Sequence, residues 1–300
     1  MAVKKLKYFA GGRWLDSKCE KYMDVYNPST GEVIAQTPCC TKEEVNEAIA
    51  CAKEAFKSWS NVPVMKRIQV IYKFRELLEE HMDELTELCA TEHGKVWNEA
   101  KGDILKVKEP VELACSAPSL LMGESVRDTS SGYDTTLYRE PVGVFAGIVP
   151  FNFPGMIPMG WMSPICIACG NTIVLKAASM TPMTCMRLAE LWQEAGLPDG
   201  VINIVTCSRN EAEIFMQHPD YLYSMSQYEG EGITFVGSTS VGLHIYSQAA
   251  ANGKRVQALC EAKNHGLVLE DAALERSARG IINSSFGCAG ERCMALPVIV

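Results

Sequence analysis

The stretch Val142-Gly143-Val144-Phe145-Ala146-Gly147-Ile148-Val149 decides the fold class of this 300-residue chain. It is a short, continuous apolar run followed by a proline, which is typical of a buried strand in a parallel sheet. From here helical and strand patterns alternate, with helices expected at 155–169, 181–195, 209–217 and 239–251 and strands at 171–176, 201–206 and 233–236. Such alternation predicts an α/β fold, a Rossmann-like, mostly parallel sheet with helices on both faces.

Residues 1–40, before this alternation, predict short strands joined by turns such as Gly11-Gly12. The first strong helix begins at Thr41, where Glu44 three residues later completes a capping box. This part of the chain is therefore expected to pack against the sheet and to extend the same domain.

Two more helical patterns and one strand pattern follow. A long helix starts at Pro63 and ends at Gly94, and a third helical region covers 97–121 with an interruption at Pro110. Residues 135–140 are expected to form a strand that projects between turn-rich stretches. The apolar stripes of these helices are expected to pack in the core.

The part of the chain beyond Arg255 starts a second α/β unit. Its expected elements are a strand, a turn at 263–266, a strand at 267–269, a helix at 272–285 and the start of a strand at 297–300. A turn-rich surface loop is expected at 219–232. Because a parallel α/β domain should not stop inside a strand, we expect the second domain to be truncated and the chain to be part of a longer protein.

Composition and charge limit the classes of function. Apolar residues make up 47% and charged residues 21%, as in a globular protein with a large core. A net charge of −8 without a basic run argues against a nucleic-acid surface, and no stretch resembles a signal peptide or a membrane span, so a cytoplasmic protein is expected. Thirteen scattered cysteines indicate free thiols, and five dispersed histidines argue against a zinc site.

Cys293, near the end of the glycine-rich stretch 286–293, is the candidate nucleophile. Arg292 precedes it, and nearby positive charge favours the reactive thiolate. With an aldehyde, such a thiolate forms a thiohemiacetal, and loss of hydride to a nicotinamide leaves a thioester. Asn152, between Pro150 and Pro154, offers an amide donor for the oxyanion. The plainer alternatives are a small buried cysteine and an Asx turn.

A dinucleotide site is indicated by Gly237-Ser238-Thr239-Ser240-Val241-Gly242, which follows a strand and opens a helix. Backbone amides at a helix N-terminus bind a pyrophosphate, although serine and threonine there are equally good N-caps. Lys176 ends a strand at the same edge, where it would meet a ribose hydroxyl or a phosphate, or simply solvent. Ser179 lies three residues after Lys176, at a position where an acidic residue would have indicated a free 2′-hydroxyl on the ribose, as in NAD. The serine does not distinguish the two cofactors, and NAD is the expected one.

These motifs together resemble the aldehyde dehydrogenase superfamily over essentially the whole chain. The matching motifs are Phe-Asn-Phe-Pro at 151–154, Leu-Lys-Ala at 175–177, Gly-Ser-Thr-x-x-Gly at 237–242 and Gly-Glu-Arg-Cys at 290–293. Residues 252–257, 262–265 and 292–296 are similar to the CoA-acylating methylmalonate-semialdehyde dehydrogenase group.

The resemblance implies a role for each matching residue. Cys293 matches the nucleophile and Asn152 the oxyanion-hole asparagine. The implied cofactor-binding residues are Pro150, Phe151, Lys176, Ser179, Gly237, Ser238 and Gly242. The implied partners of a substrate carboxylate are Arg292 and, where the group has a second arginine, Lys106. No metal is implied.

The resemblance also implies a division into domains. Residues 1–127 and 142–257 correspond to the NAD-binding domain, 128–141 to an oligomerisation strand, and 258–300 to the start of the catalytic domain. A homo-oligomer, dimer or tetramer, is expected for the full-length protein.

Leu259 departs from the pattern of hydrolytic members, which carry a glutamate four residues before the lysine corresponding to Lys263. Without that base, attack of water on a thioester is slow, whereas a thiol such as coenzyme A is a good nucleophile. The resemblance and Leu259 together imply NAD-dependent oxidation of a short semialdehyde, of the methylmalonate or malonate type, with acyl transfer to CoA. The alternatives are a hydrolytic aldehyde dehydrogenase and a non-catalytic nucleotide-binding module.

Overall fold

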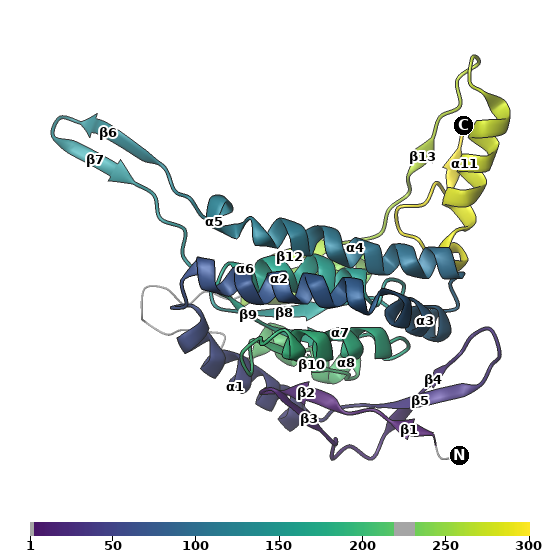
Figure 1. Ribbon diagram of the computed structural model, residues 1–300, viewed down its shortest axis with the longest axis horizontal. Coiled ribbons are helices and arrows are strands. Elements are labelled where there is room, and N and C mark those ends of the chain that lie inside the picture. The colour runs from purple at the N-terminus through teal and green to yellow at the C-terminus, as the bar shows by residue number, and fades with distance from the viewer. Residues whose placement is uncertain (1–2, 219–231) are drawn as a thin grey trace.

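The main sheet has seven strands in the order β12-β11-β8-β9-β10-β2-β3 (Figure 1). The computed structural model describes residues 3–218 and 232–300, so nearly all of the loop expected at 219–232 lies outside the described residues. The parallel strands are β8 (Val144–Ile148), β9 (Thr172–Lys176), β10 (Ile202–Val205), β11 (Gly232–Val236) and β12 (Arg255–Leu259). Antiparallel β2 (Tyr8–Ala10) and β3 (Arg13–Leu15) close one edge. The predicted mostly parallel α/β sheet is confirmed.

Side chains along the central strands alternate between two cores. On β9, Ile173 and Leu175 belong to the large core, which also contains residues of α2, α4 and α7, whereas Val174 belongs to the second core, with residues of α1 and α10. Because both faces of the strand are covered, all three side chains are fully buried and the strand reads as a continuous apolar run.

The helices that connect the parallel strands lie close to the predicted positions. They are η1 (Ile157–Met162), α6 (Ser163–Ala168), α7 (Met183–Glu194), α8 (Arg209–Ala212), α9 (Ile214–Gln217) and α10 (Thr239–Ala251). Two single helices of the prediction are split. The first begins as a wide π-turn, in which the carbonyl of Pro158 accepts hydrogen bonds from the backbone amide and from the hydroxyl of Ser163. The helix expected at 209–217 is divided at Glu213.

The helices that precede the parallel strands in the chain are α1 (Lys42–Trp59), α2 (Val64–Glu80), α3 (Met82–His93), α4 (Trp97–Cys115) and α5 (Ala117–Leu120). The capping box at the start of α1 is present, since the hydroxyl of Thr41 accepts from the amide of Glu44 and the carboxylate of Glu44 accepts from the amide of Thr41. Gly94 ends α3 in the left-handed conformation, with φ at 83°. The predicted single helix up to Gly94 is broken at His81.

The expected interruption at Pro110 was wrong. α4 runs through this residue without a break and ends only at Cys115. The proline removes one backbone hydrogen bond, but Val107, Val111 and Ala114 are fully buried around it in the large core. Burial of this apolar stripe offsets the loss of one donor.

A hairpin of β6 (Ser125–Ser130) and β7 (Tyr133–Thr136) projects from the body of the molecule (Figure 1). Every residue of both strands is exposed. The strand expected at 135–140 is therefore wrong in its extent, because the pairing of β6 with β7 sets the strand bounds and ends with Ser125 opposite Thr136. A smaller sheet of β1 (Lys4–Lys5), β5 (Val33–Pro38) and β4 (Tyr22–Tyr26) confirms the short strands expected near the N-terminus.

The chain beyond β12 forms a second projection with α11 (Leu274–Phe286), η3 (Cys288–Gly290) and a parallel pair of β13 (His265–Gly266) and β14 (Val298–Ile299) (Figure 1). The strand expected at 267–269 was wrong in its position. The observed strand is β13 at 265–266, because β14 is only two residues long and pairs with these two residues. α11 buries none of its own residues.

Candidate functional site

The predicted cofactor residues gather at one edge of the sheet. Ile148 of β8 lies opposite Lys176 of β9 on one side and Phe235 of β11 on the other, so these three adjacent strands end level with one another. Pro150, Phe151 and Asn152 follow β8, and Gly237 and Ser238 follow β11. The chain runs from β8 through β9 to β10 in one direction and returns to β11 on the other side of β8. This reversal is a topological switch point, and open α/β sheets bind ligands in the crevice outside the carboxyl ends of the strands at such a point.

The loop that carries Cys293 is attached to this edge. The side-chain amide nitrogen of Asn152 donates a hydrogen bond of 2.6 Å to the carbonyl oxygen of Glu291, across 139 positions of sequence. On the other side of the loop, the amide of Asn264 donates to the carbonyls of Cys293 at 3.4 Å and of Ala295 at 3.0 Å. Cys293 is half-buried between these two supports. The structure thus brings together the two residues that sequence reasoning selected for catalysis.

Asn152 keeps one N–H for a ligand. Its amide nitrogen has two hydrogens, and one of them is taken by the Glu291 carbonyl. Its carbonyl oxygen is buried and has no hydrogen-bond partner in the described part of the chain. The bond to Glu291 therefore holds the amide in one orientation, as an oxyanion donor requires.

The side chain of Arg292 is held by neighbouring residues and does not point freely into solvent. Its Nη2 donates to the Sγ of the buried Cys288 at 3.3 Å and lies 3.7 Å from a carboxylate oxygen of Glu99 on α4. Lys106 lies seven residues after Glu99, about 10 Å further along the same face of that helix. Its ammonium group is exposed and pairs with Glu109 at 2.7 Å. The structure therefore places Arg292 against the start of α4 and does not bring Lys106 into contact with it.

A buried histidine next to the site was not predicted. The imidazole of His93 is 1% exposed, and its Nε2 lies 3.3 Å from the carboxylate of Glu291. Its ring also stacks on that of Phe151, with centroids 6.3 Å apart. Burial, together with the nearby charge of Lys95, lowers the pKa of His93 to about 4, so the ring is neutral at pH 7.

A buried ion pair supports the backbone after β8. Lys95 and Asp103 lie 2.8 Å apart, and both side chains are fully buried. The other oxygen of Asp103 accepts the backbone amide of Met156 at 2.8 Å, and the Lys95 ammonium lies 3.9 Å from the ring centre of Phe153. These contacts fix the turn that contains Asn152. Sequence patterns alone give no sign of them, since Lys95 lies in the loop between α3 and α4 and Asp103 lies inside α4.

The N-terminus of α10 fits an anionic ligand. Ser238 is the N-cap residue, but its side chain makes no capping hydrogen bond. The amide of Gly237 donates to the carbonyl of Leu259 at 3.1 Å, which sets the loop against β12. A β-carbon at Gly242 would collide with the Sγ of Cys260, so this glycine lets α10 approach the end of β12. The arrangement leaves helix-terminal amides available for a pyrophosphate.

Lys176 lies at the edge of this crevice and is partly buried. Burial lowers the pKa of its ammonium group, and the neighbouring Cys207 and Cys39 oppose this shift. At the end of β12 the position of the missing base is held by Leu259, which is 45% exposed. An apolar side chain is therefore exposed at the position where the resemblance implies a carboxylate in hydrolytic members.

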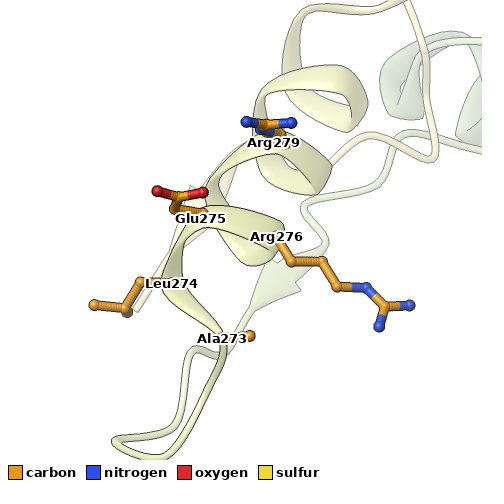
Figure 2. A pocket seen from close by; sticks show the side chains of 5 residues that line it. All are labelled: Ala273, Leu274, Glu275, Arg276 and Arg279. Carbon is orange, nitrogen blue, oxygen red and sulfur yellow. The ribbon is translucent and has the colours of Figure 1, made fainter.

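A surface depression of about 520 Å³ lies away from these residues. It is lined by Ala273, the N-cap residue of α11, and by four residues of that helix, and Figure 2 shows that Leu274 and Arg276 point to opposite sides of the helix. These side chains do not converge on a ligand position. Cys166 and Cys169 have the Cys-x-x-Cys spacing, which the sequence reasoning missed, but burial raises the pKa of both thiols and this argues against a redox pair.

The arrangement of the sheet edge and the attached cysteine loop fits the aldehyde dehydrogenase family. The chain belongs to this family, whose sequence profile matches residues 14–300. Within residues 3–218 and 232–300, no helix has both the length and the apolar character needed to cross a bilayer.

Individual relatives narrow the comparison. The chain is 49% identical over 298 residues to malonate-semialdehyde dehydrogenase 1 of Geobacillus thermodenitrificans, covering 99% of this chain and 60% of that protein. It is 47% identical to malonate-semialdehyde dehydrogenase of Lacticaseibacillus casei, covering 99% and 58%. The chain thus spans about 60% of the length of these relatives.

Solved structures agree with this assignment. The crystal structure of methylmalonate-semialdehyde dehydrogenase from Oceanimonas doudoroffii superposes with a TM-score of 0.91 at 40% identity, covering 99% of this chain and 59% of that one. The NAD+ complex of aldehyde dehydrogenase from Bacillus cereus superposes with a TM-score of 0.90 at 31% identity, with the same coverage of 99% and 59%.

Proposed function

We propose that the whole protein oxidises a short semialdehyde of the malonate or methylmalonate type with NAD and transfers the acyl group to coenzyme A. The observation that carries this proposal is the 2.6 Å hydrogen bond from Asn152 to the Glu291 carbonyl, which holds the cysteine loop at the dinucleotide crevice. The semialdehyde relatives and the NAD+ complex of a family member support the same choice of substrate and cofactor.

In this reaction Cys293 adds to the aldehyde carbon, and the free N–H of Asn152 donates to the oxygen that becomes negative. NAD supplies the hydride acceptor, and Lys176, Gly237, Ser238 and the first amides of α10 would hold it, with Pro150, Phe151, Ser179 and Gly242 shaping the crevice. Loss of hydride converts the thiohemiacetal into a thioester on Cys293. Arg292 and Lys106 supply the positive charge that a substrate carboxylate requires.

The residue at position 259 indicates how the acyl group is released from Cys293. Leu259 cannot activate water, so the thioester persists until a thiol attacks its carbonyl carbon. Coenzyme A supplies that thiol, and Cys293 leaves as a thiolate. The same exposed leucine argues against the hydrolytic alternative.

The test is NADH formation from malonate or methylmalonate semialdehyde, with and without CoA. We expect turnover that depends on CoA, and we expect Cys293→Ser to abolish it while Cys288→Ser, in the same loop, keeps it. Introducing a base with Leu259→Glu should raise the CoA-independent rate, whereas Leu259→Gln should not.

Equal turnover without CoA would contradict acyl transfer and favour a hydrolytic enzyme. Binding of NAD without any NADH formation would instead favour a nucleotide-binding module.

A further inference from the structure

Glu261 places a carboxylate at the N-terminus of α10. It lies two residues beyond the end of β12, and its Oε2 accepts a hydrogen bond of 3.0 Å from the hydroxyl of Thr239, the first residue of the helix. Glu261 is exposed, so no packing requirement holds its side chain there. The contact joins the segment after β12 to the first residue of α10.

The N-terminus of α10 attracts negative charge of any origin. The first amides of a helix and its dipole stabilise a nearby carboxylate as they stabilise a phosphate. The N-cap residue, Ser238, makes no side-chain capping bond, so Glu261 is the acidic group that takes the favourable position beside this helix end. A carboxylate and a pyrophosphate at the same helix end repel each other, and this repulsion weakens binding of the ligand.

We infer that Glu261 is an affinity-setting residue of the dinucleotide site, whose carboxylate occupies the mouth of the pyrophosphate position and has to move away when a dinucleotide binds. This inference rests on the proposed assignment of the crevice to NAD. It differs from a role in catalysis, because Glu261 contacts the helix end through Thr239 and is placed to act on binding.

The experiment measures NAD binding by isothermal titration calorimetry for the wild-type chain and for Glu261→Gln, which keeps the size of the side chain and removes its charge. We expect the variant to bind about three- to tenfold more tightly at low ionic strength, because one like charge is removed from the neighbourhood of a doubly charged pyrophosphate. This difference should shrink in roughly 0.5 M salt, where the Debye length falls to about 4 Å.

Glu270→Gln is the matched control, since it removes the same charge from an exposed glutamate outside the crevice. It should leave the affinity unchanged. Inorganic pyrophosphate, used as a competitor, should show the same order of affinities as NAD.

Equal or weaker binding by Glu261→Gln, with binding by the wild type intact, would overturn this inference alone. Binding to neither protein would overturn the assignment of the dinucleotide site and the inference with it. A gain of affinity is not expected from structural damage, so tighter binding supports the inference directly.

Discussion

At the scale of single residues, the site depends on side chains that join distant parts of the chain. Asn152 connects the end of β8 to the cysteine loop, and His93 faces Glu291 in the same loop. Neither contact involves neighbours in sequence, so each is a product of the fold. Glu291 therefore makes both contacts: its backbone carbonyl accepts a hydrogen bond from Asn152, and its carboxylate faces the imidazole of His93.

His93 should make stability depend on pH. Its pKa is near 4 when folded, below the ordinary value of 6.5, so the unfolded chain binds the proton more tightly. The stability that the neutral ring contributes is full above about pH 6.5 and is lost as pH falls toward 4. Between pH 7.5 and pH 4.5, the free energy of unfolding should therefore fall by on the order of 2–3 kcal/mol more for the wild type than for His93→Gln, as measured by urea unfolding.

The neighbouring Glu92 makes this comparison with a variant necessary. Burial raises the pKa of Glu92 to about 7, and a raised carboxyl pKa lowers stability as pH rises from about 4.5 to 7. This opposite contribution is common to wild type and variant and cancels in the difference. His265→Gln, at an exposed position, is the control, and equal pH dependence of wild type and His93→Gln would contradict the prediction.

At the scale of elements, the hydrogen bonds at the start of α1 allow the contribution of a helix cap to stability to be measured. Glu44 is buried and accepts hydrogen bonds from the amides of Thr41 and Lys18 and from the hydroxyl of Ser17. Thr41→Ala should cost about 1 kcal/mol of unfolding free energy, the usual value for an N-cap. Glu44→Ala should cost more, roughly 2–3 kcal/mol, because it leaves several donors without their acceptor.

Urea unfolding followed by circular dichroism measures both changes. Thr30→Ala, at an exposed position of the turn after β4, is a suitable control and should change the free energy of unfolding by less than about 0.5 kcal/mol. A Glu44→Ala effect no larger than that of Thr41→Ala would contradict the role given to the buried carboxylate.

The parallel strands were predictable because burial on both faces makes them continuous apolar runs, as at β8 and β9. The capping box at Thr41 was predictable because it is local. Pro110 was not, since tertiary packing of α4 overrides a local preference that the sequence shows clearly. The prediction of the bounds of β13 was wrong for a related reason, because the length of this strand is set by its partner β14, about 30 positions away.

The site shows the same division. The residue types and the edge of the sheet could be predicted, since Lys176 ends an apolar strand and Asn152 and Gly237 each follow one. Contacts between side chains of distant segments could not, and the Thr239–Glu261 hydrogen bond is an example. Whether the cited residues bind NAD or a carboxylate stays a prediction.

At the scale of the whole molecule, the β6–β7 hairpin stands apart from the cores. All its strand residues are exposed, and the amide of Leu137 donates to the carbonyl of Glu124 at 2.8 Å, so the two ends of the hairpin lie side by side. The hairpin therefore can be removed without stretching the chain. Its projection suits a contact with a second subunit.

Deletion of residues 125–136 tests this. Because no core side chain is lost, the free energy of unfolding of the monomeric unit should change by less than about 1 kcal/mol. If the hairpin mediates assembly, size-exclusion chromatography with light scattering should show loss of the oligomer. An unchanged oligomer with the hairpin removed would place the subunit interface elsewhere.

The bond between Asn152 and Glu291 also has a mechanical meaning. Asn152 lies just beyond the carboxyl end of β8 and its bond partner Glu291 lies two residues before Cys293, so the end of one sheet strand fixes the position of the cysteine loop. Under the proposed function, the distance between the Cys293 sulfur and a bound nicotinamide is then set by the fold itself, before any ligand arrives.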